Sequence, residues 1–369
     1  MRGYRIGLAV ALLCAGVSAA RAQLAQQIPT LYQTNVPGWV LGRGFGVPAA
    51  LDYDFANNRY YEQGVSLCTS PASCVAVSRG STGTNLLPTS PAGFAYATFA
   101  ANTPRIMGGA GLLVEEARTN QLKNSAAPAT QTTGSLGTGT YTLWVNGAGS
   151  ATMSAGTGTG CGSGAATQGS PVNFTITGAG TCTVTVVGSL SAFQLEAGSF
   201  GTSFIVTAGA TATRAADVVT TALTVGASYT FSAIGTPLAP ASFAANQSFF
   251  ALSDGTSSNR IVTFRAATTG SVSASSISAG VNTGFSPGTA WATGAVGKLA
   301  VTSQPGATAA VFNAGTAATA APAAQPVGIN QIQFGANGAA LGAWDGYISR
   351  AALWPSTALP TARLQQLTQ

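Results

Sequence analysis

The chain contains no histidine among its 369 residues, and only 7% of its residues are charged. Without an imidazole, Ser-His-Asp and Cys-His catalytic devices are excluded, and so are His-ligated metal sites. The charged fraction also lies far below the usual level of about 25%. Any catalysis would therefore depend on the nine acidic residues.

No apolar run is long enough to cross a bilayer as a helix, which takes about 20 residues. The apolar run Ile6–Val17 is shorter, follows two arginines, and precedes small residues around Ala22. This pattern is typical of a secretory signal, so we predict that residues 1–22 are removed before Gln23. The expected location is secreted, periplasmic or at the cell surface, with no membrane span.

The basic surplus of the chain is small. Loss of Arg2, Arg5 and Arg21 with the signal lowers the fifteen basic residues to twelve, against nine acidic ones, so the net charge falls from +6 to +3. These charges are spread singly along the chain. We therefore expect no nucleic-acid partner.

Cysteine is scarce, and its use fits an exported chain. Of five cysteines, Cys14 leaves with the signal and four remain: Cys68, Cys74, Cys161 and Cys182. An even number in an exported protein suggests disulfides. Three pairings are open, and proximity in sequence favours Cys68 with Cys74 and Cys161 with Cys182. A zinc site is disfavoured because neither pair is a C-x-x-C and no histidine can complete it.

The remaining composition favours an all-β protein. Hydrophobic residues make up 46% of the chain, and they recur in short runs separated by Gly, Ser, Pro or Asn, as in a sandwich or barrel. Predicted strands include residues 51–55, 111–115, 139–145, 182–187, 192–196, 247–253, 260–266, 331–334 and 344–354. Leu364 and Leu367 lie at helical spacing after Pro360, so a short C-terminal helix is expected.

Four segments in the first half resemble one known group of proteins. They are "LDYDFANNRYY" (51–61), "GLLVEEARTNQLKNS" (111–125), "FQLEAGSFGTSFI" (193–205) and "ATATRAADVV" (210–219). In this order they look like phage- and prophage-associated tail or virion-surface proteins with a carbohydrate-binding-module-like β-sandwich. The second half, which ends in "WDGYISRAALWP" (344–355), resembles the concanavalin A-like, or laminin-G-like, jelly roll.

The two resemblances define the expected organisation. An irregular lead-in (23–48) is followed by a phage-type carbohydrate-binding-module-like sandwich (49–215) and a jelly roll (216–369). They imply attachment or recognition, often of glycans, and no reaction. A secretion signal is foreign to virion proteins, so a bacterial protein built from phage-derived modules is favoured.

The adjacent acids Glu115 and Glu116 are the first candidates for catalysis. Neighbouring side chains of an extended segment point to opposite faces, whereas glycoside hydrolysis needs two carboxyls that face one sugar. We therefore predict a structural role, in which Glu115 and Glu116 form ion pairs with Arg118 or another basic group at a strand-to-turn junction. No catalytic residue is assigned.

Calcium is the one ion that the remaining acids could hold. Asp52 and Asp54 share a strand face, and Asp254, Asn259 and Asp345 offer oxygen ligands. A solvated strand face explains the first two equally well, and an ordinary turn explains Asp254. We assign no metal ligand and expect no cofactor.

Aromatic rings supply the candidate ligand contacts, because a sugar ring stacks on an aromatic face. Trp291, Trp344 and Tyr347 are the candidates in the second half; Trp39, Tyr60, Tyr61 and Trp144 are the alternatives in the first. Trp291 stands among Gly and Thr and is expected to be the most exposed.

The sequence thus predicts a secreted, non-enzymatic protein of two β-sandwiches that binds a glycan or a cell-surface polysaccharide. The alternative is a structural phage-tail-like or cell-surface assembly protein without glycan binding. Its large neutral surface would favour homo-oligomers.

Overall fold

The structure is a computed structural model that describes residues 36–63, 68, 70–241, 245–338 and 344–369. The predicted signal (1–22) and the first part of the lead-in (23–35) lie outside the described residues. Short elements open the described part: a 3₁₀ helix η1 (Arg43–Phe45) and, further on, helix α2 (Pro71–Cys74). Among the described residues, no helix is long and apolar enough to span a membrane.

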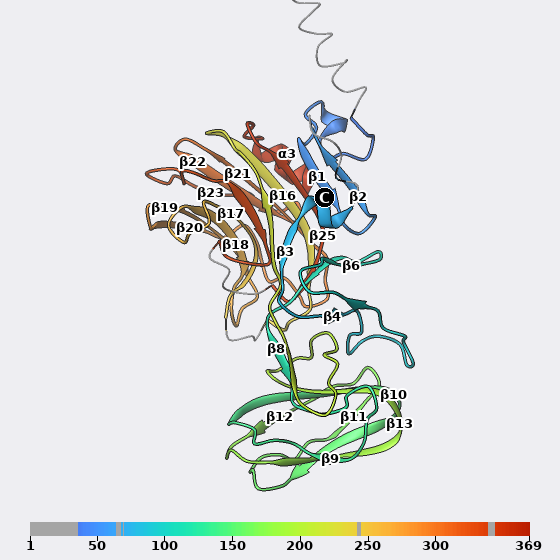
Figure 1. The fold of residues 1–369 in the computed structure, drawn as a ribbon. Helices are drawn as coiled ribbons and strands as arrows, with labels where there is room; N and C mark the ends of the chain where they lie inside the picture. Colours follow the sequence, from blue (N-terminus) through green and yellow to red (C-terminus); the bar gives the residue numbers. More distant parts are fainter. Residues whose placement is uncertain (1–35, 64–67, 69, 242–244, 339–343) are drawn as a thin grey trace, which may run out of the picture.

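Two large antiparallel sheets face each other and form the upper body in Figure 1, here called the sandwich. The first sheet has nine strands, with β2-β1-β25-β16-β21-β22-β23 in order and β7 and β6 joined beside β25. Their bounds are β1 (Leu51–Asp54), β2 (Arg59–Glu62), β6 (Arg105–Met107), β7 (Gly111–Val114), β16 (Tyr229–Pro237), β21 (Gly297–Gln304), β22 (Ala307–Phe312), β23 (Ala318–Ala320) and β25 (Gly346–Trp354).

The second sheet has seven strands in the order β20-β19-β18-β17-β24-β15-β3. Their bounds are β3 (Ala76–Ser78), β15 (Val218–Ala222), β17 (Gln247–Ser253), β18 (Arg260–Arg265), β19 (Val272–Ser278), β20 (Val281–Phe285) and β24 (Gln331–Phe334). Strands β17 and β18 form the hairpin expected around Asp254, with partners from Gln247–Arg265 to Ser253–Arg260.

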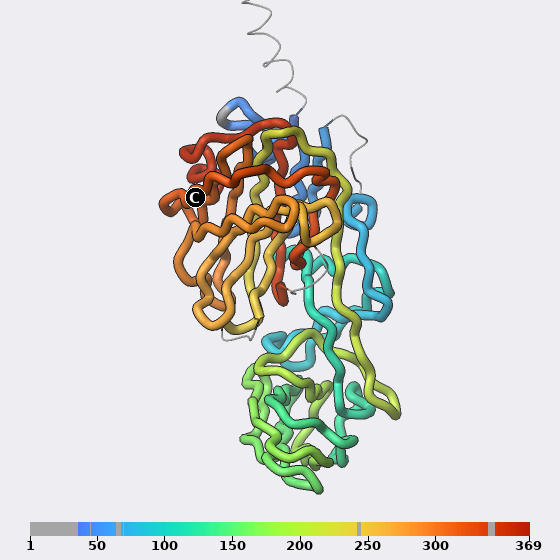
Figure 2. The backbone as a smooth tube through the Cα atoms, turned by 90° about the vertical axis from the view of Figure 1, so that its left-hand side faces the viewer, coloured from blue at the N-terminus to red at the C-terminus, as the bar shows by residue number. Residues whose placement is uncertain are grey.

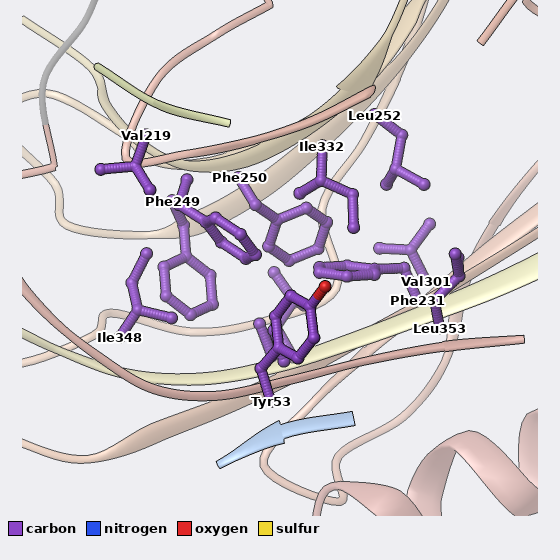
Figure 3. Packing of buried hydrophobic residues seen from close by; sticks show 14 of the residues in the cluster. Tyr53, Val219, Phe231, Phe249, Phe250, Leu252, Val301, Ile332, Ile348 and Leu353 are labelled. Atoms are coloured by element: carbon purple, nitrogen blue, oxygen red, sulfur yellow. The ribbon is translucent and has the colours of Figure 1, made fainter. Parts of the chain in front are cut away.

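The facing sides of the two sheets enclose one aromatic-rich core (Figure 3). Phe231 of β16 packs edge-on against Phe250 of β17, with ring centroids 4.6 Å apart. Tyr53 of β1 lies in the same cluster and is fully buried. Each such buried ring stabilises the fold by about 1.5–3 kcal/mol relative to an exposed one, so this core holds the two sheets together. The predicted all-β sandwich is confirmed.

The division predicted at residues 215/216 does not match the strand pairing. Strand β1 pairs with β25, so that Asp52 lies opposite Ala352, and β7 pairs with the same strand at Ile348–Leu112. On the other sheet β3 pairs with β15, with Val77 opposite Val219. Strands from both halves of the sequence therefore build one sandwich, and the predicted pair of consecutive domains is corrected. The physical reason is that sheet neighbours need not be neighbours in sequence.

Residues 118–214 form a second, smaller body, here called the insert lobe (Figure 2). Its five-stranded sheet has the order β11-β10-β13-β9, with β12 also on β10. Two short ladders account for the remaining strands of the described residues: β8 pairs with β14, and β4 pairs with β5, which precedes the insert lobe in the chain. The bounds are β4 (Gly83–Thr84), β5 (Thr98–Phe99), β8 (Arg118–Asn120), β9 (Gln131–Thr132), β10 (Gly139–Ala155), β11 (Ala165–Thr167), β12 (Val172–Ile176), β13 (Cys182–Ala197) and β14 (Ala212–Arg214).

The insert lobe has a core of its own, which includes Leu143, Val184, Phe193 and the disulfide between Cys161 and Cys182. This disulfide confirms one of the two predicted pairs. Cys68 and Cys74 are free thiols, so the other predicted pair is wrong in this structure. The Sγ of Cys68 lies 3.2 Å from Glu62 Oε1, and Cys74 Sγ lies 3.2 Å from the carbonyl of Ser70.

The predicted C-terminal helix is confirmed as α3 (Thr361–Leu367). Leu364 and Leu367 are buried and pack in a cluster on the outer side of the nine-stranded sheet, with Ala300 and Trp354. Pro360 occupies the N-cap position, and no side chain caps the helix there. Packing of its apolar face therefore stabilises this short helix.

The disulfide should stabilise the insert lobe, because it closes a loop with a sequence separation of 21 residues. The variant C161A/C182A should unfold with a free energy lower by about 3 kcal/mol. Hydrogen exchange of the β10 and β13 amides would measure this. A C68S/C74S variant, which keeps the disulfide, is the control. Equal protection in C161A/C182A and the control would contradict a stabilising role.

Candidate ligand-binding site

Trp291 and Trp344 lie inside the sandwich core. Trp291 is 2% exposed and Trp344 is fully buried, and their ring centroids are 4.8 Å apart. The expectation that Trp291 is exposed is therefore wrong. Its small neighbours make room for the ring: a Cβ on Gly297 would lie 2.3 Å from Trp291 Cε2. Neither ring offers a face to a ligand in this structure.

Tyr347, the third predicted contact, is half-buried on β25. Burial and, to a lesser extent, the nearby charge of Glu115 raise the pKa of its phenol to about 12. Tyr347 is therefore a neutral hydroxyl beside the junction of the two bodies. The structure does not bring it together with an open aromatic surface.

Glu115 lies at the centre of a buried ion network between the sandwich and the insert lobe. Its Oε2 is 2.7 Å from Arg105 Nη1 of β6 and 2.7 Å from Arg214 Nη1 of β14. Ser203 donates to the same carboxylate from its hydroxyl at 2.6 Å and from its backbone N–H at 2.8 Å. The predicted ion-pair role of Glu115 is thus observed, but its partners are Arg105 and Arg214 rather than Arg118.

Asp217 completes this network. It pairs with Arg105 and, at 2.8 Å, with Arg79 Nη1, and its Oδ2 accepts a hydrogen bond from the backbone N–H of Glu115. The side chains of Arg79 and Arg105 have no exposed surface. Three arginines thus face two acids, and Arg79 gives its remaining N–H groups to the carbonyls of Ser81 and Ala100. Buried charges are tolerated only when they are paired in this way.

Glu116 points the other way and pairs with Arg118, as predicted for these two residues. Asp345 adds a third carboxyl at this junction: its Oδ1 accepts from the backbone N–H of Glu116 at 2.9 Å, while its Oδ2 has no hydrogen-bond partner. Burial, and then the charge of Glu116, raise the pKa of Asp345 well above its usual value. Asp345, directly before β25, therefore holds its proton to a higher pH than an exposed aspartate does.

The other acids that were considered for calcium, without being assigned as ligands, are engaged with protein groups. Asp52 pairs with Arg350 at 2.7 Å, and Asp54 pairs with Arg59 at 2.5 Å. Asp254 accepts from the backbone N–H of Thr256 and from Asn259, as in an ordinary Asx turn. The described part of the chain holds no group of three or more Cys, Asp or Glu residues suited to a metal ion.

A cavity of about 300 Å³, here called the interlobe pocket, lies between the sandwich and the insert lobe. The sandwich contributes Leu238, Pro240 and Thr293. The insert lobe contributes Thr142, Pro171, Asn173 and the loop Ser199–Gly201, and the segment 87–89 closes the remaining side. Phe200, which is half-buried, supplies the aromatic surface of this cavity.

The position of Phe200 is fixed by Arg118. The guanidinium of Arg118 stacks over the Phe200 ring at 4.8 Å from its centroid. Gly198 has a φ of +123°, and a Cβ there would lie 2.0 Å from Arg118 Nη1. Only glycine therefore lets the chain pass this guanidinium and turn Phe200 toward the pocket.

The polar groups of the pocket are held in place by neighbours. The hydroxyl of Thr142 lies 2.7 Å from Asn173 Oδ1, and Asn173 Nδ2 donates to the carbonyl of Ser199 at 2.8 Å. Thr293 accepts from Arg265 Nη2 and donates to the carbonyl of Ala239. One aromatic ring with a few fixed hydroxyl and amide groups is suited to bind a small ring with polar edges.

Sequence reasoning did not find Phe200. The residue lies in "EAGSFGTSF", where Gly and Ser flank an aromatic at the end of a strand. An aromatic between glycines at a strand end is a signal for a surface loop. The same kind of signal at Trp291 was misleading, so local composition does not separate the two cases.

Fold and pocket together define an all-β sandwich protein with an inserted β lobe. No protein-family model matches the chain. No curated protein matches it either.

Several solved structures match part of this chain. A CBM40 module of the Ruminococcus gnavus IT-sialidase, bound to α2,3-sialyllactose, is 14% identical with a TM-score of 0.34, and the match covers 40% of this chain and 84% of that one. Domain 4 of AbnA, a GH43 extracellular arabinanase from Geobacillus stearothermophilus in complex with arabinotriose, is 17% identical with a TM-score of 0.34; coverage is 42% and 73%. A SAP-like pentraxin from Limulus polyphemus is 14% identical with a TM-score of 0.30, covering 40% and 72%. At TM-scores this low, these similarities carry no argument about a ligand or a reaction.

Glu115 should make the protein acid-sensitive. Burial alone would raise its pKa, but Arg214 and Arg105 outweigh it and lower the pKa to about 2 from the usual 4.5. A lowered pKa stabilises the fold above about pH 4.5, and this contribution is lost as the pH falls toward 2. The variant E115Q should unfold with a free energy lower by about 3 kcal/mol at pH 7. Urea unfolding at pH 7 and pH 3 measures both effects; equal stability of variant and wild type at pH 7 would show that the pairs contribute nothing.

Asp345 should have the opposite effect on how the stability of the fold changes with pH. Its pKa is raised in the folded state, so its stabilising contribution is present at low pH and is lost as the pH rises above the unfolded value near 3.8. The variant D345N should therefore be more stable than the wild type at pH 7, by about 1–3 kcal/mol, and no more stable at pH 3.5. Asn also tolerates the φ of +48° found at this position. A D345N protein that unfolds more easily than the wild type at pH 7 would contradict a raised pKa of Asp345.

Proposed function

We propose that this chain is a non-enzymatic glycan-binding or surface-attachment protein that holds a sugar in the interlobe pocket. The observation that supports this proposal is the pocket itself. The Phe200 ring lies beside the hydroxyl groups of Thr142 and Thr293 and the side-chain amide of Asn173, which are held in place by hydrogen bonds. A sugar has apolar C–H faces and polar edges, and this arrangement complements both. A volume of about 300 Å³ is at the lower end for ligand pockets and fits a sugar unit at the end of a chain.

The distribution of carboxylates supports binding rather than turnover. All nine acidic residues of the chain lie in its described part, and no acid is among the described residues that line the interlobe pocket. Glycoside hydrolysis needs two carboxyls about 5–10 Å apart at the scissile bond. At the junction, Glu115, Glu116 and Asp217 are instead paired with arginines. A ligand in this pocket would therefore leave unchanged.

The proposal includes export. Residues 1–22, which we predict to be a secretory signal, lie outside the described residues, and a glycan-binding protein would meet its ligand at a cell surface or in the medium. The disulfide Cys161–Cys182 fits an oxidising compartment. An origin from phage-derived modules stays a prediction from the sequence.

Glycan-array screening of the chain without residues 1–22, followed by calorimetry on the hits, tests the proposal. The variant F200L keeps an apolar side chain but loses the ring face, and should weaken sugar binding by about 5- to 10-fold. F285L is the matched control, because Phe285 is a half-buried ring of β20 outside the pocket. A wild type that binds no glycan, or an F200L that binds as tightly as F285L, would contradict the proposal.

A further inference from the structure

The wall of the interlobe pocket carries no charge. Its lining consists of prolines, leucines, small polar residues and the Phe200 ring, and no acidic or basic residue is among the described residues that line it. An ionic group inside this pocket would lose hydration without gaining a contact to an opposite charge, which is unfavourable. The pocket is therefore suited to an uncharged group.

Thr293 offers the pocket a hydrogen-bond acceptor. This exposed residue donates its hydroxyl hydrogen to the carbonyl of Ala239 at 3.1 Å and accepts from Arg265 Nη2 at 3.1 Å. A hydroxyl group has one hydrogen and two lone pairs, so one lone pair remains for a ligand. A ligand group that meets Thr293 must therefore be a donor.

Asn173, which is also exposed, can still donate to a ligand. Its Oδ1 lies 2.7 Å from the hydroxyl of Thr142, and its Nδ2 donates to the carbonyl of Ser199 at 2.8 Å. A side-chain amide has two N–H hydrogens and two oxygen lone pairs, so one of each remains. Because the contact to Ser199 fixes which end of the amide carries the nitrogen, the remaining N–H has a defined place in the pocket wall.

Apolar side chains make up much of the remaining wall. They are Leu87, Pro88, Pro171, Phe200, Leu238 and Pro240. Burial of a methyl group against such a surface is favourable, whereas burial of a hydroxyl group without a partner is not. The wall therefore favours a ligand that carries an apolar substituent in addition to its polar groups.

We infer that the interlobe pocket recognises the acetamido group of an N-acetylhexosamine. The N–H and C=O of a trans amide point in opposite directions. The two bodies that enclose the pocket supply the matching groups: Thr293 of the sandwich accepts from the N–H, and Asn173 of the insert lobe donates to the C=O. The methyl group packs on the apolar wall. The inference rests on the proposed function for the sugar ring at Phe200, and it adds the group by which the pocket selects that sugar.

A ligand carboxylate is the competing class, because the cation of Arg265 lies behind Thr293. The Arg265 side chain is buried and does not line the pocket; its Nη1 donates to the carbonyl of Ala239 and its Nη2 to Thr293. A carboxylate has two acceptor oxygens and no hydrogen to donate, so it would leave the lone pair of Thr293 unmatched. An amide supplies the missing donor, which favours the acetamido group over an acid.

Calorimetry and saturation-transfer NMR with a matched series of methyl glycosides test the inference. The series compares N-acetylglucosamine and N-acetylgalactosamine with glucose and galactose, with glucosamine as the cationic probe and glucuronate as the anionic probe. An N-acetyl sugar should bind about tenfold more tightly than the hexose of the same configuration. Glucosamine and glucuronate should bind no more tightly than glucose, because no opposite charge lines the pocket.

Two variants separate recognition of the acetamido group from stacking on the ring. N173A and T293V should each reduce the N-acetyl preference to about twofold or less and leave the affinity for glucose nearly unchanged. F200L should weaken all neutral sugars to a similar extent and keep the preference. N282A and T283V, on β20 outside the pocket, are the matched controls.

The outcomes distinguish this inference from the proposed function. An N-acetyl preference that N173A and T293V remove and F200L keeps would support the inference. Binding that depends on Phe200 but shows no N-acetyl preference, or that favours glucuronate, would overturn it and leave the proposed function standing. A preference that survives in both N173A and T293V would overturn it as well. Absence of any sugar binding would overturn the proposed function and this inference with it. Thermal melting of each variant against its control, together with the glucose affinity, shows whether the fold and the Phe200 loop are kept.

Discussion

The buried ion network of Arg79, Arg105, Glu115, Arg214 and Asp217 is the interaction on which the arrangement of the two bodies depends. The chain leaves the sandwich just after β7, at Glu115, and returns to it just after β14, at Asp217. Both crossings carry an acid, and the backbone N–H of Asp217 donates to the carbonyl of Glu115. Because Arg105 pairs with both acids, the two crossings are tied to each other and to β6.

The network determines which groups can contact one another, in addition to contributing to stability. A buried ion pair is weak evidence for net stability, because the desolvation of two charges offsets much of their attraction. An unpaired member, however, is strongly unfavourable, so the groups tolerate few other arrangements. Ser203, next to the loop that carries Phe200, donates to Glu115 by side chain and backbone. The same network that fixes the crossing therefore holds that loop against the sandwich and gives the interlobe pocket its shape.

The fold was predictable from the sequence as far as local patterns determine it. Alternating apolar residues and turn residues located β17 and β24 with the bounds that the structure has, and the spacing of Leu364 and Leu367 located α3. Two predicted strands, at 182–187 and 192–196, are parts of one long strand β13, since Gly188 did not interrupt its pairing with β10. The partners of each strand were not predictable. Asp52 and its partner Arg350 are separated by 298 residues, and the sequence around one does not indicate that it pairs with the other.

The candidate site shows the same limit at the level of single side chains. Trp291 and Phe200 both stand beside glycine, and in both cases a glycine admits a large group close to the backbone. At Gly297 the admitted group is the Trp291 ring itself, which fills the core, whereas at Gly198 it is the Arg118 guanidinium, which leaves Phe200 at the cavity wall. The two rings differ in the surface that lies next to them. Trp291 lies next to strands of its own sandwich, whereas Phe200 faces the other body across the interlobe pocket. That surface depends on the pairing of segments that are distant in sequence. For Glu115 the sequence was more informative, because alternation along a strand separates it from Glu116 and favoured an ion pair over a catalytic pair of acids. Its burial and its arginine partners, Arg105 and Arg214, required the structure.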